Sequence, residues 1–277
     1  CEAYQMMEEY LGFDEDKMSE IFGQWNKEEL DSYLIEITEK ILAFKDEDGS
    51  PLVRKIMDRA GQKGTGKWTV DSCLELGIPV TLIGEAVFSR CLSALKEERQ
   101  IAAEQIMGPT VEIDPHYSDK DSFVPLIKEA LYSSKIISYA QGYMLMREAA
   151  KDQGWNLNFG AIALMWRGGC IIRSRFLADI KVAFDKDPNL QNLLLDGFFQ
   201  KEIARCANSW RKVVAEATLN GIPVPAFSTA LSFYDGYRRA RLPANLLQAQ
   251  RDFFGAHTYE RVDKPRGEWF HTDWIGA

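Results

Sequence analysis

Apolar residues along the 277-residue chain recur every three or four positions, which is the spacing of amphipathic helices. In residues 28–44, for example, one such stripe consists of Leu30, Leu34, Ile37, Ile41 and Leu42. No segment alternates apolar and polar residues with period two over a useful length, as a half-buried strand would. The pattern therefore predicts a nearly all-α fold.

Further helices are predicted between glycines, prolines and polar turns, with residues 108–116 as an irregular connection. These helices span residues 1–11, 14–25, 52–59, 68–77, 81–105, 123–152, 159–166, 170–185, 188–195, 198–218 and 225–237. The end of the chain has no periodicity but is rich in aromatic residues. Because aromatic side chains are seldom left loose in water, we expect this tail to dock on a surface.

The chain contains an internal repeat, because Gly77-Ile-Pro-Val recurs as Gly221-Ile-Pro-Val, each time before an apolar helix start. Other matches in the same order pair Tyr4 with Tyr143, Trp25 with Trp166, and residues 30–42 with 171–184. The sequence thus predicts a tandem duplication of a multi-helix repeat. We expect repeat one at about 1–116 and repeat two at about 123–262, together forming one helical domain, 1–262, followed by an irregular tail, 263–277.

Composition narrows the class of protein. A formal net charge of −8 argues against a nucleic-acid footprint, which requires a basic face. No apolar run is long enough to span a membrane, and the three histidines lack the spacing of metal ligands. Five cysteines without C-x-x-C spacing indicate free thiols in a reducing compartment, so we expect a cytoplasmic protein. The chain starts at Cys1 inside a helical pattern, and we expect it to be a fragment of a longer polypeptide.

Residues 58–68 are the densest candidate site, because Gly61, Gly64 and Gly66 alternate there with Lys63, Thr65 and Lys67. Glycines let the backbone approach a ligand closely, and backbone N–H groups at a helix N-terminus attract anions. The loop is neither a P-loop nor a dinucleotide fingerprint, because both the spacing and a preceding strand are missing. The residues alone leave two interpretations open: a phosphate or carboxylate site, or a connector between two helices.

Three further residues could bind an anion. Arg90 lies one helix after the glycine loop, and the Gly77 turn would fold its helix back against the loop; the aligned residue in the second repeat is Tyr234. Arg251 and His257 flank Gly255 near the end of the chain. Arginine holds phosphate bidentately, although Arg90 could also be an ordinary surface residue. Gly255 could equally be a helix cap, with His257 near the negative end of the helix dipole.

Four long motifs in order, residues 56–68, 163–173, 221–237 and 245–260, resemble the 6-phosphogluconate dehydrogenase family. The resemblance covers essentially the whole chain and corresponds to the helical C-terminal part of that family, itself a tandem duplication. It implies oxidative decarboxylation of 6-phosphogluconate to ribulose 5-phosphate with NADP as hydride acceptor. By motif, Lys63, Thr65 and Arg90 would hold the substrate phosphate. Arg251 and His257 would reach the substrate of the partner subunit in a homodimer, and the tail would cross that partner.

The same resemblance implies what lies outside these residues. In the family, a Rossmann-type domain that binds NADP precedes this part, and the general-base lysine and the proton-donating glutamate would lie upstream of Cys1. We therefore expect no catalytic residue in this chain and no turnover by these 277 residues alone. Two alternatives remain: a non-catalytic helical dimerisation module, or a related hydroxyacid dehydrogenase that acts on another acid.

Overall fold

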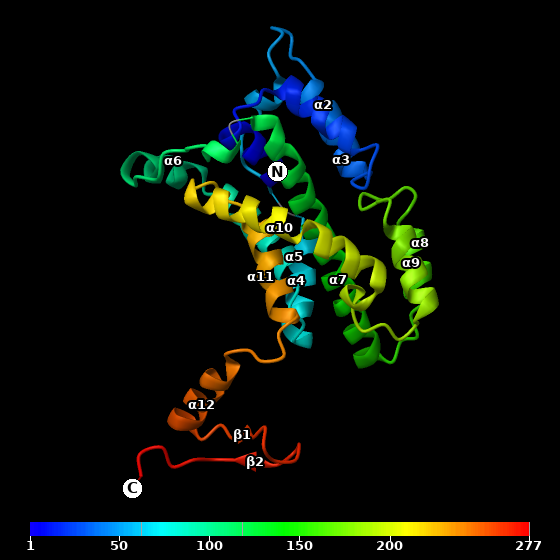
Figure 1. Ribbon diagram of the computed structural model, residues 1–277, viewed down its shortest axis with the longest axis vertical. Helices are drawn as coiled ribbons and strands as arrows, with labels where there is room; N and C mark the ends of the chain where they lie inside the picture. Colours follow the sequence, from blue (N-terminus) through cyan, green and yellow to red (C-terminus); the bar gives the residue numbers. More distant parts are fainter. Residues whose placement is uncertain (62, 118, 277) are drawn as a thin grey trace. The chain divides into compact units, whose positions relative to one another are not determined.

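The computed structural model describes residues 1–61, 63–117 and 119–276, and it confirms the all-α prediction (Figure 1). The only sheet among these residues pairs two short strands, β1 (Tyr259–Glu260) and β2 (Trp269–Phe270). The main helices are α1 (Glu2–Gln5), α2 (Glu15–Trp25), α3 (Tyr33–Ala43), α4 (Thr65–Leu76), α5 (Thr81–Ser93), α6 (Lys96–Gln105), α7 (Val124–Gln153), α8 (Phe159–Met165), α9 (Leu177–Lys186), α10 (Gly197–Leu219), α11 (Pro225–Tyr237) and α12 (Ala244–Gly255).

The chain forms two compact units, Cys1–Ser232 and Phe233–Ala277. The predicted boundary at 262/263 falls inside the second unit, between β1 and β2. The second unit therefore groups the predicted tail with α12. The assignment of residues 1–262 to one domain stays a prediction.

Several predicted helices were too long. Residues 81–105 form two helices, α5 and α6, because the chain leaves helical geometry at Leu95, where Arg99 Nη2 bonds the Ser93 carbonyl at 3.2 Å. Residues 188–195 form only a 3-10 turn, Leu193–Leu195, because the Asn192 side chain takes the Leu194 N–H and competes with a helix. Residues 52–59 likewise shorten to the 3-10 turn Leu52–Lys55. The helices predicted at 28–44 and 170–185 begin later, at Tyr33 and Leu177.

The core of the first unit lies between α7 and α10, which pack against each other. On α10 the fully buried residues follow a helical stripe, Phe199, Ile203, Cys206, Trp210, Val213 and Ala217. The Trp210 indole Nε1 donates to the Phe227 carbonyl at 3.1 Å, which ties α10 to α11. Burial of this stripe stabilises the folded unit by about 25 cal/mol per Å² of apolar surface removed from water.

The repeated tetrapeptide has the same geometry in both copies. Gly77 and Gly221 both have φ of 67°, the left-handed conformation that a glycine adopts without strain. Ile78 N bonds Cys73 O at 2.9 Å, and Ile222 N bonds Ala217 O at 2.9 Å, so each helix ends in a Schellman motif. The α4–α5 turn of repeat one thus matches the α10–α11 turn of repeat two, and the α2–α3 pair likewise matches the α8–α9 pair.

The two repeats meet through backbone bonds between equivalent positions. Ser32 and Ser174, both buried, form an isolated antiparallel bridge just before α3 and α9. Tyr33 N bonds Arg173 O at 3.3 Å, and Arg175 N bonds Asp31 O at 3.0 Å. Tyr33 is equivalent to Arg175, and Asp31 is equivalent to Arg173, so the two bonds join the same pair of positions in opposite directions. The repeats are therefore related locally by a two-fold axis.

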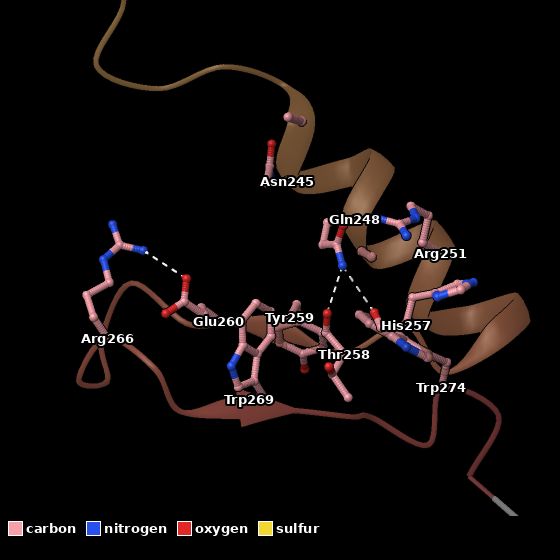
Figure 2. Close-up of a pocket in the computed structure, with 12 residues that line it drawn as sticks. Asn245, Gln248, Arg251, His257, Thr258, Tyr259, Glu260, Arg266, Trp269 and Trp274 are labelled. Atoms are coloured by element: carbon pink, nitrogen blue, oxygen red, sulfur yellow. Dashed lines mark hydrogen bonds and ion pairs between the residues drawn. The ribbon is translucent and has the colours of Figure 1, made fainter. Parts of the chain in front are cut away.

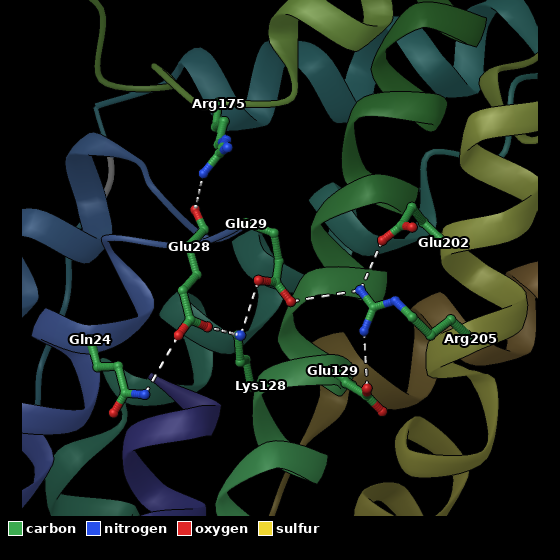
Figure 3. Close-up of polar contacts among 8 residues, drawn as sticks. All are labelled: Gln24, Glu28, Glu29, Lys128, Glu129, Arg175, Glu202 and Arg205. Atoms are coloured by element: carbon green, nitrogen blue, oxygen red, sulfur yellow. Dashed lines mark hydrogen bonds and ion pairs between the residues drawn. The ribbon is translucent and has the colours of Figure 1, made fainter.

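An ion network also joins the repeats (Figure 3). Lys128 of α7 pairs with Glu28 and with Glu29, the latter at 3.0 Å. Arg205 of α10 reaches Glu29 at 3.6 Å and also binds Glu129 and Glu202 at 3.0 and 2.8 Å. Because Glu29 contacts both cations, the network connects the loop before α3 with both core helices.

Lys135 is an exception to this pairing. Its Nζ is buried without a hydrogen-bond partner and lies 5.4 Å from the centre of the Phe176 ring. Burial lowers the pKa of Lys135 to about 7, against a smaller raising effect of Asp31. The unfolded chain, with an ordinary lysine pKa of about 10.4, thus binds more protons than the folded chain between pH 7 and 10.

We predict that the free energy of unfolding rises over this window, by up to about 1 kcal/mol per pH unit, because the folded state carries the neutral amine. Lys135→Met should flatten this rise and raise the melting temperature at pH 7, because no buried amine then needs to lose its proton. Denaturant titrations at several pH values measure both effects. Lys151→Met, an exposed site on the same helix, is the control; an unchanged pH slope in Lys135→Met would contradict the prediction.

Candidate functional site

The glycine loop ends at the N-terminus of α4, as the sequence predicts. Gly64, with φ of 110°, is the N-cap residue, and no side chain caps the helix. The N–H groups of the first turn, from Thr65 on, have no partners within a helix and point outward at the positive end of its dipole. This arrangement favours an anion at the loop.

Close packing of α4 against α5 requires one of the glycines. A Cβ on Gly66 would lie 2.8 Å from Cγ2 of Val87 on α5. Arg90, also on α5, donates from Nη2 to the carbonyl of Gly61, so this guanidinium reaches the glycine loop. Lys63, Thr65 and Arg90 are all exposed. The structure therefore brings these three predicted residues to one loop and its neighbouring helix.

The start of the loop is anchored by α6 and the end of α5. Asp58 pairs with Lys96 at 2.6 Å and with Arg99 at 2.9 Å, and Ala60 N bonds Ser93 Oγ at 3.0 Å. Hydrogen bonds from Lys96 and Arg99 lower the pKa of Asp58 to about 2. Asp58 therefore stays ionised and remains paired with Lys96 and Arg99. These two cations are then not free to draw an anion away from the loop. These anchors were not predicted from the sequence, although Asp58 stands within the loop motif.

Arg251 and His257 belong to the second unit, where they line a cavity of about 750 Å³ (Figure 2). The cavity lies between α12 and the chain that follows it, with aromatic side chains on its wall, Tyr259, Trp269 and Trp274. Both predicted residues are exposed. The structure thus brings Arg251 and His257 together, as the sequence predicts.

Gln248, on the same helix, contacts both of these residues. Its Nε2 donates to the His257 and Thr258 carbonyls at 3.1 and 2.8 Å, and its Oε1 accepts from Arg251 Nη1 at 3.0 Å (Figure 2). Gln248 was not predicted from the sequence to have a role. A glutamine within a helical motif carries no signal of the carbonyls that it will meet.

Asp252 holds the end of the chain on α12. This residue is fully buried and accepts hydrogen bonds from His271 Nδ1 at 2.8 Å, Thr272 N at 3.0 Å and Trp274 Nε1 at 2.8 Å. Burial raises the pKa of Asp252, but these hydrogen bonds outweigh it, and the pKa lies below its usual value. The expected docking of the aromatic tail is therefore seen within the second unit.

The described residues contain no group of three or more side chains arranged to hold a metal ion. Among the same residues, no helix has the length and apolar character that crossing a membrane demands.

Comparison with known proteins identifies relatives along the whole chain. Residues 1–274 match the family model described as "6-phosphogluconate dehydrogenase, C-terminal domain". Proteins named "6-phosphogluconate dehydrogenase, decarboxylating" from Ovis aries and Ceratitis capitata are 61% and 63% identical to all of this chain. The chain spans 56% of their length. A solved structure, described as "Plasmodium falciparum 6-phosphogluconate dehydrogenase in its apo form, in complex with its cofactor NADP+ and in complex with its substrate 6-phosphogluconate", superimposes with a TM-score of 0.94. It is 44% identical, and the match covers 99% of this chain and 58% of that one.

We predict that Asp252→Ala releases the chain end from α12, because three donors lose their common acceptor. Hydrogen exchange at residues 271–276 should become faster, with little change in the first unit. In the unsubstituted chain, protection of these residues should persist above about pH 4 and fall as the pH drops through the lowered pKa, because only the carboxylate accepts all three bonds. Asp263→Ala, which removes an exposed carboxylate paired with Arg261, is the control; equal exchange in both variants would refute the role of Asp252.

Proposed function

The chain belongs to the 6-phosphogluconate dehydrogenase family, and from this we propose that it supplies the substrate-phosphate site of an enzyme that oxidatively decarboxylates 6-phosphogluconate. The product would be ribulose 5-phosphate, and NADP would accept the hydride. The observation that carries this proposal is the uncapped N-terminus of α4, with Arg90 donating to the loop that precedes it.

A phosphate dianion fits the chemistry of this loop. Lys63 would contribute an ammonium group, Thr65 a hydroxyl group and Arg90 its remaining guanidinium N–H groups, while the first-turn amides of α4 donate along the helix dipole. Because Asp58 is already paired with Lys96 and Arg99, it offers the anion little repulsion. The loop would thereby fix one end of the sugar acid and orient its other end for the reaction.

The described residues do not fit a dinucleotide. A Rossmann-type site needs parallel strands and a glycine turn between a strand and a helix, whereas the only sheet here joins two antiparallel two-residue strands. We therefore assign no NADP contact and no proton transfer to this chain. Its proposed part is to bind and orient the substrate.

We also propose a homodimer in which Arg251 and His257 complete the site of the partner subunit. Large apolar side chains on α12 support a protein interface, because Leu246, Leu247, Phe253 and Phe254 are each more than half exposed. Clusters of this kind are rarely left in water. A cytoplasmic location accords with five cysteines that form no disulfide.

The substrate site predicts a large effect of Arg90→Ala in the enzyme that contains this chain. The KM for 6-phosphogluconate should rise about 10- to 100-fold, because a dianion loses a charged hydrogen-bond donor. Steady-state kinetics measure this change. Arg59→Ala removes an exposed cation from the same loop and should leave the KM nearly unchanged. Equal KM increases in the two variants would mean that Arg90 acts only through its charge and not through a direct contact with the phosphate. An unchanged KM in Arg90→Ala would instead mean that Arg90 is an ordinary surface arginine.

The composite site predicts complementation between two variants that bind the substrate weakly, assayed at a 6-phosphogluconate concentration below the KM of the unsubstituted enzyme. Arg90→Ala and His257→Ala damage opposite halves of the site, so a dimer with one copy of each has one intact site. Random reassociation of equal amounts should restore about a quarter of the unsubstituted activity, because about half of the two-fold dimers are mixed. Mixing Arg90→Ala with Lys63→Ala should restore nothing, since both belong to one half. No recovery in the first mixture would mean that each site is built from one subunit.

A further inference from the structure

The His257 ring rests against the end of α12. An added Cβ at Gly255 would lie 2.9 Å from His257 Cδ2 and 3.0 Å from Nε2, so only glycine leaves room for the ring in this orientation. The next residue, Ala256, has φ of 49° and is the only non-glycine residue with positive φ in the described chain. This left-handed residue turns the chain back so that His257 faces the helix that it has just left.

Gln248 holds the returning chain in place. It bonds two consecutive carbonyls, those of His257 and Thr258, and with its remaining polar atom it fixes Nη1 of Arg251 (Figure 2). A single side chain thus holds both the Arg251 guanidinium and the backbone that carries His257. Without it, Arg251 would be free to populate several rotamers, and the backbone at His257 would lose two hydrogen bonds within this unit.

We propose that Gln248 and Gly255 are positioning residues that preset Arg251 and His257 as one anion clamp. Gly255 sets the orientation of the imidazole ring, and Gln248 sets the backbone beneath it together with the guanidinium. Binding then costs less ordering of side chains, because the two groups are already arranged. This inference rests on the proposed function, since it takes the substrate phosphate as the anion.

Gly255 allows a test in which stability and binding move in different directions. Replacing a helix glycine by alanine ordinarily favours the helix, because alanine has the higher helix propensity. At Gly255 the new methyl group must push away the His257 ring. Gly255→Ala should therefore keep or raise the melting temperature while it weakens substrate binding, a combination that a purely structural glycine would not produce.

The experiment compares Gly255→Ala and Gln248→Ala in the complete dimeric enzyme. Each should raise the KM for 6-phosphogluconate about 10-fold and leave kcat within about twofold, because the clamp binds a group remote from the reacting carbons. The matched control is Gly142→Ala on α7, where no atom lies within 4 Å of the added Cβ and where the first repeat already carries Ala3. The control should leave the KM unchanged.

Double-mutant cycles decide whether the two residues act through the clamp. In a His257→Ala background, Gly255→Ala should have no further effect on the KM, because the ring that it displaces is gone. A full 10-fold effect in that background would overturn the role of Gly255. An unchanged KM in both single variants would overturn the proposal as a whole. If Gly255→Ala does not fold, Gln248→Ala is tested in the same way. Its effect on the KM is then compared with and without Arg251→Ala, and a full 10-fold effect in the Arg251→Ala background would overturn its role.

Failure of the proposed function gives a different result. If His257→Ala and Arg251→Ala each leave the KM unchanged, these residues do not bind the substrate, and the clamp has no phosphate to hold. If both raise the KM while Gln248→Ala and Gly255→Ala do not, the phosphate assignment stands and only the positioning role is wrong.

Discussion

The junction between the two repeats is the constraint on which the first unit depends. Two backbone hydrogen bonds, from Tyr33 to Arg173 and from Arg175 to Asp31, connect equivalent positions, and the Lys128 and Arg205 network crosses the same region. Because the repeats face each other here, the long helix α7 packs against helices of both copies and becomes the centre of the core. The α4–α5 turn, and with it the glycine loop, takes its position from this arrangement.

Much of the fold could be predicted from sequence, because period and turn chemistry are local properties. The helix end at Gly77 was predicted and is confirmed, and the second copy of the tetrapeptide, at Gly221, adopts the same turn. The errors arose where a distant partner overrode local preference. Residues 81–105 carry a continuous helical pattern, but Lys96 and Arg99 turn towards Asp58, some forty positions earlier, and the helix divides.

The residues that would bind an anion can be proposed from the sequence, but the residues that hold them in place cannot. Lysine, arginine and histidine near glycines signal an anion by residue type alone, so Lys63, Arg90, Arg251 and His257 could be proposed. Gln248 works through backbone carbonyls that come within reach only because Ala256 adopts a left-handed conformation. Asp252 works through donors some twenty positions later. Neither set of hydrogen bonds can be predicted from the spacing of residues along the chain.

The two copies of one helix differ at the end where the proposed anion site lies. Helices α4 and α10 end in the same tetrapeptide, yet α10 has 23 residues and α4 only 12. The whole difference lies at their beginnings. In α10 the extra turns continue back to Asp196, whose carboxylate accepts a hydrogen bond from Phe198 N. In repeat one the glycine loop stands in place of those turns, and α4 begins only at Thr65. The proposed site therefore lies at the start of the shorter helix. At the N-terminus of α10 a carboxylate of the chain itself accepts a hydrogen bond, whereas the N-terminus of α4 has no side-chain cap and is open to a ligand.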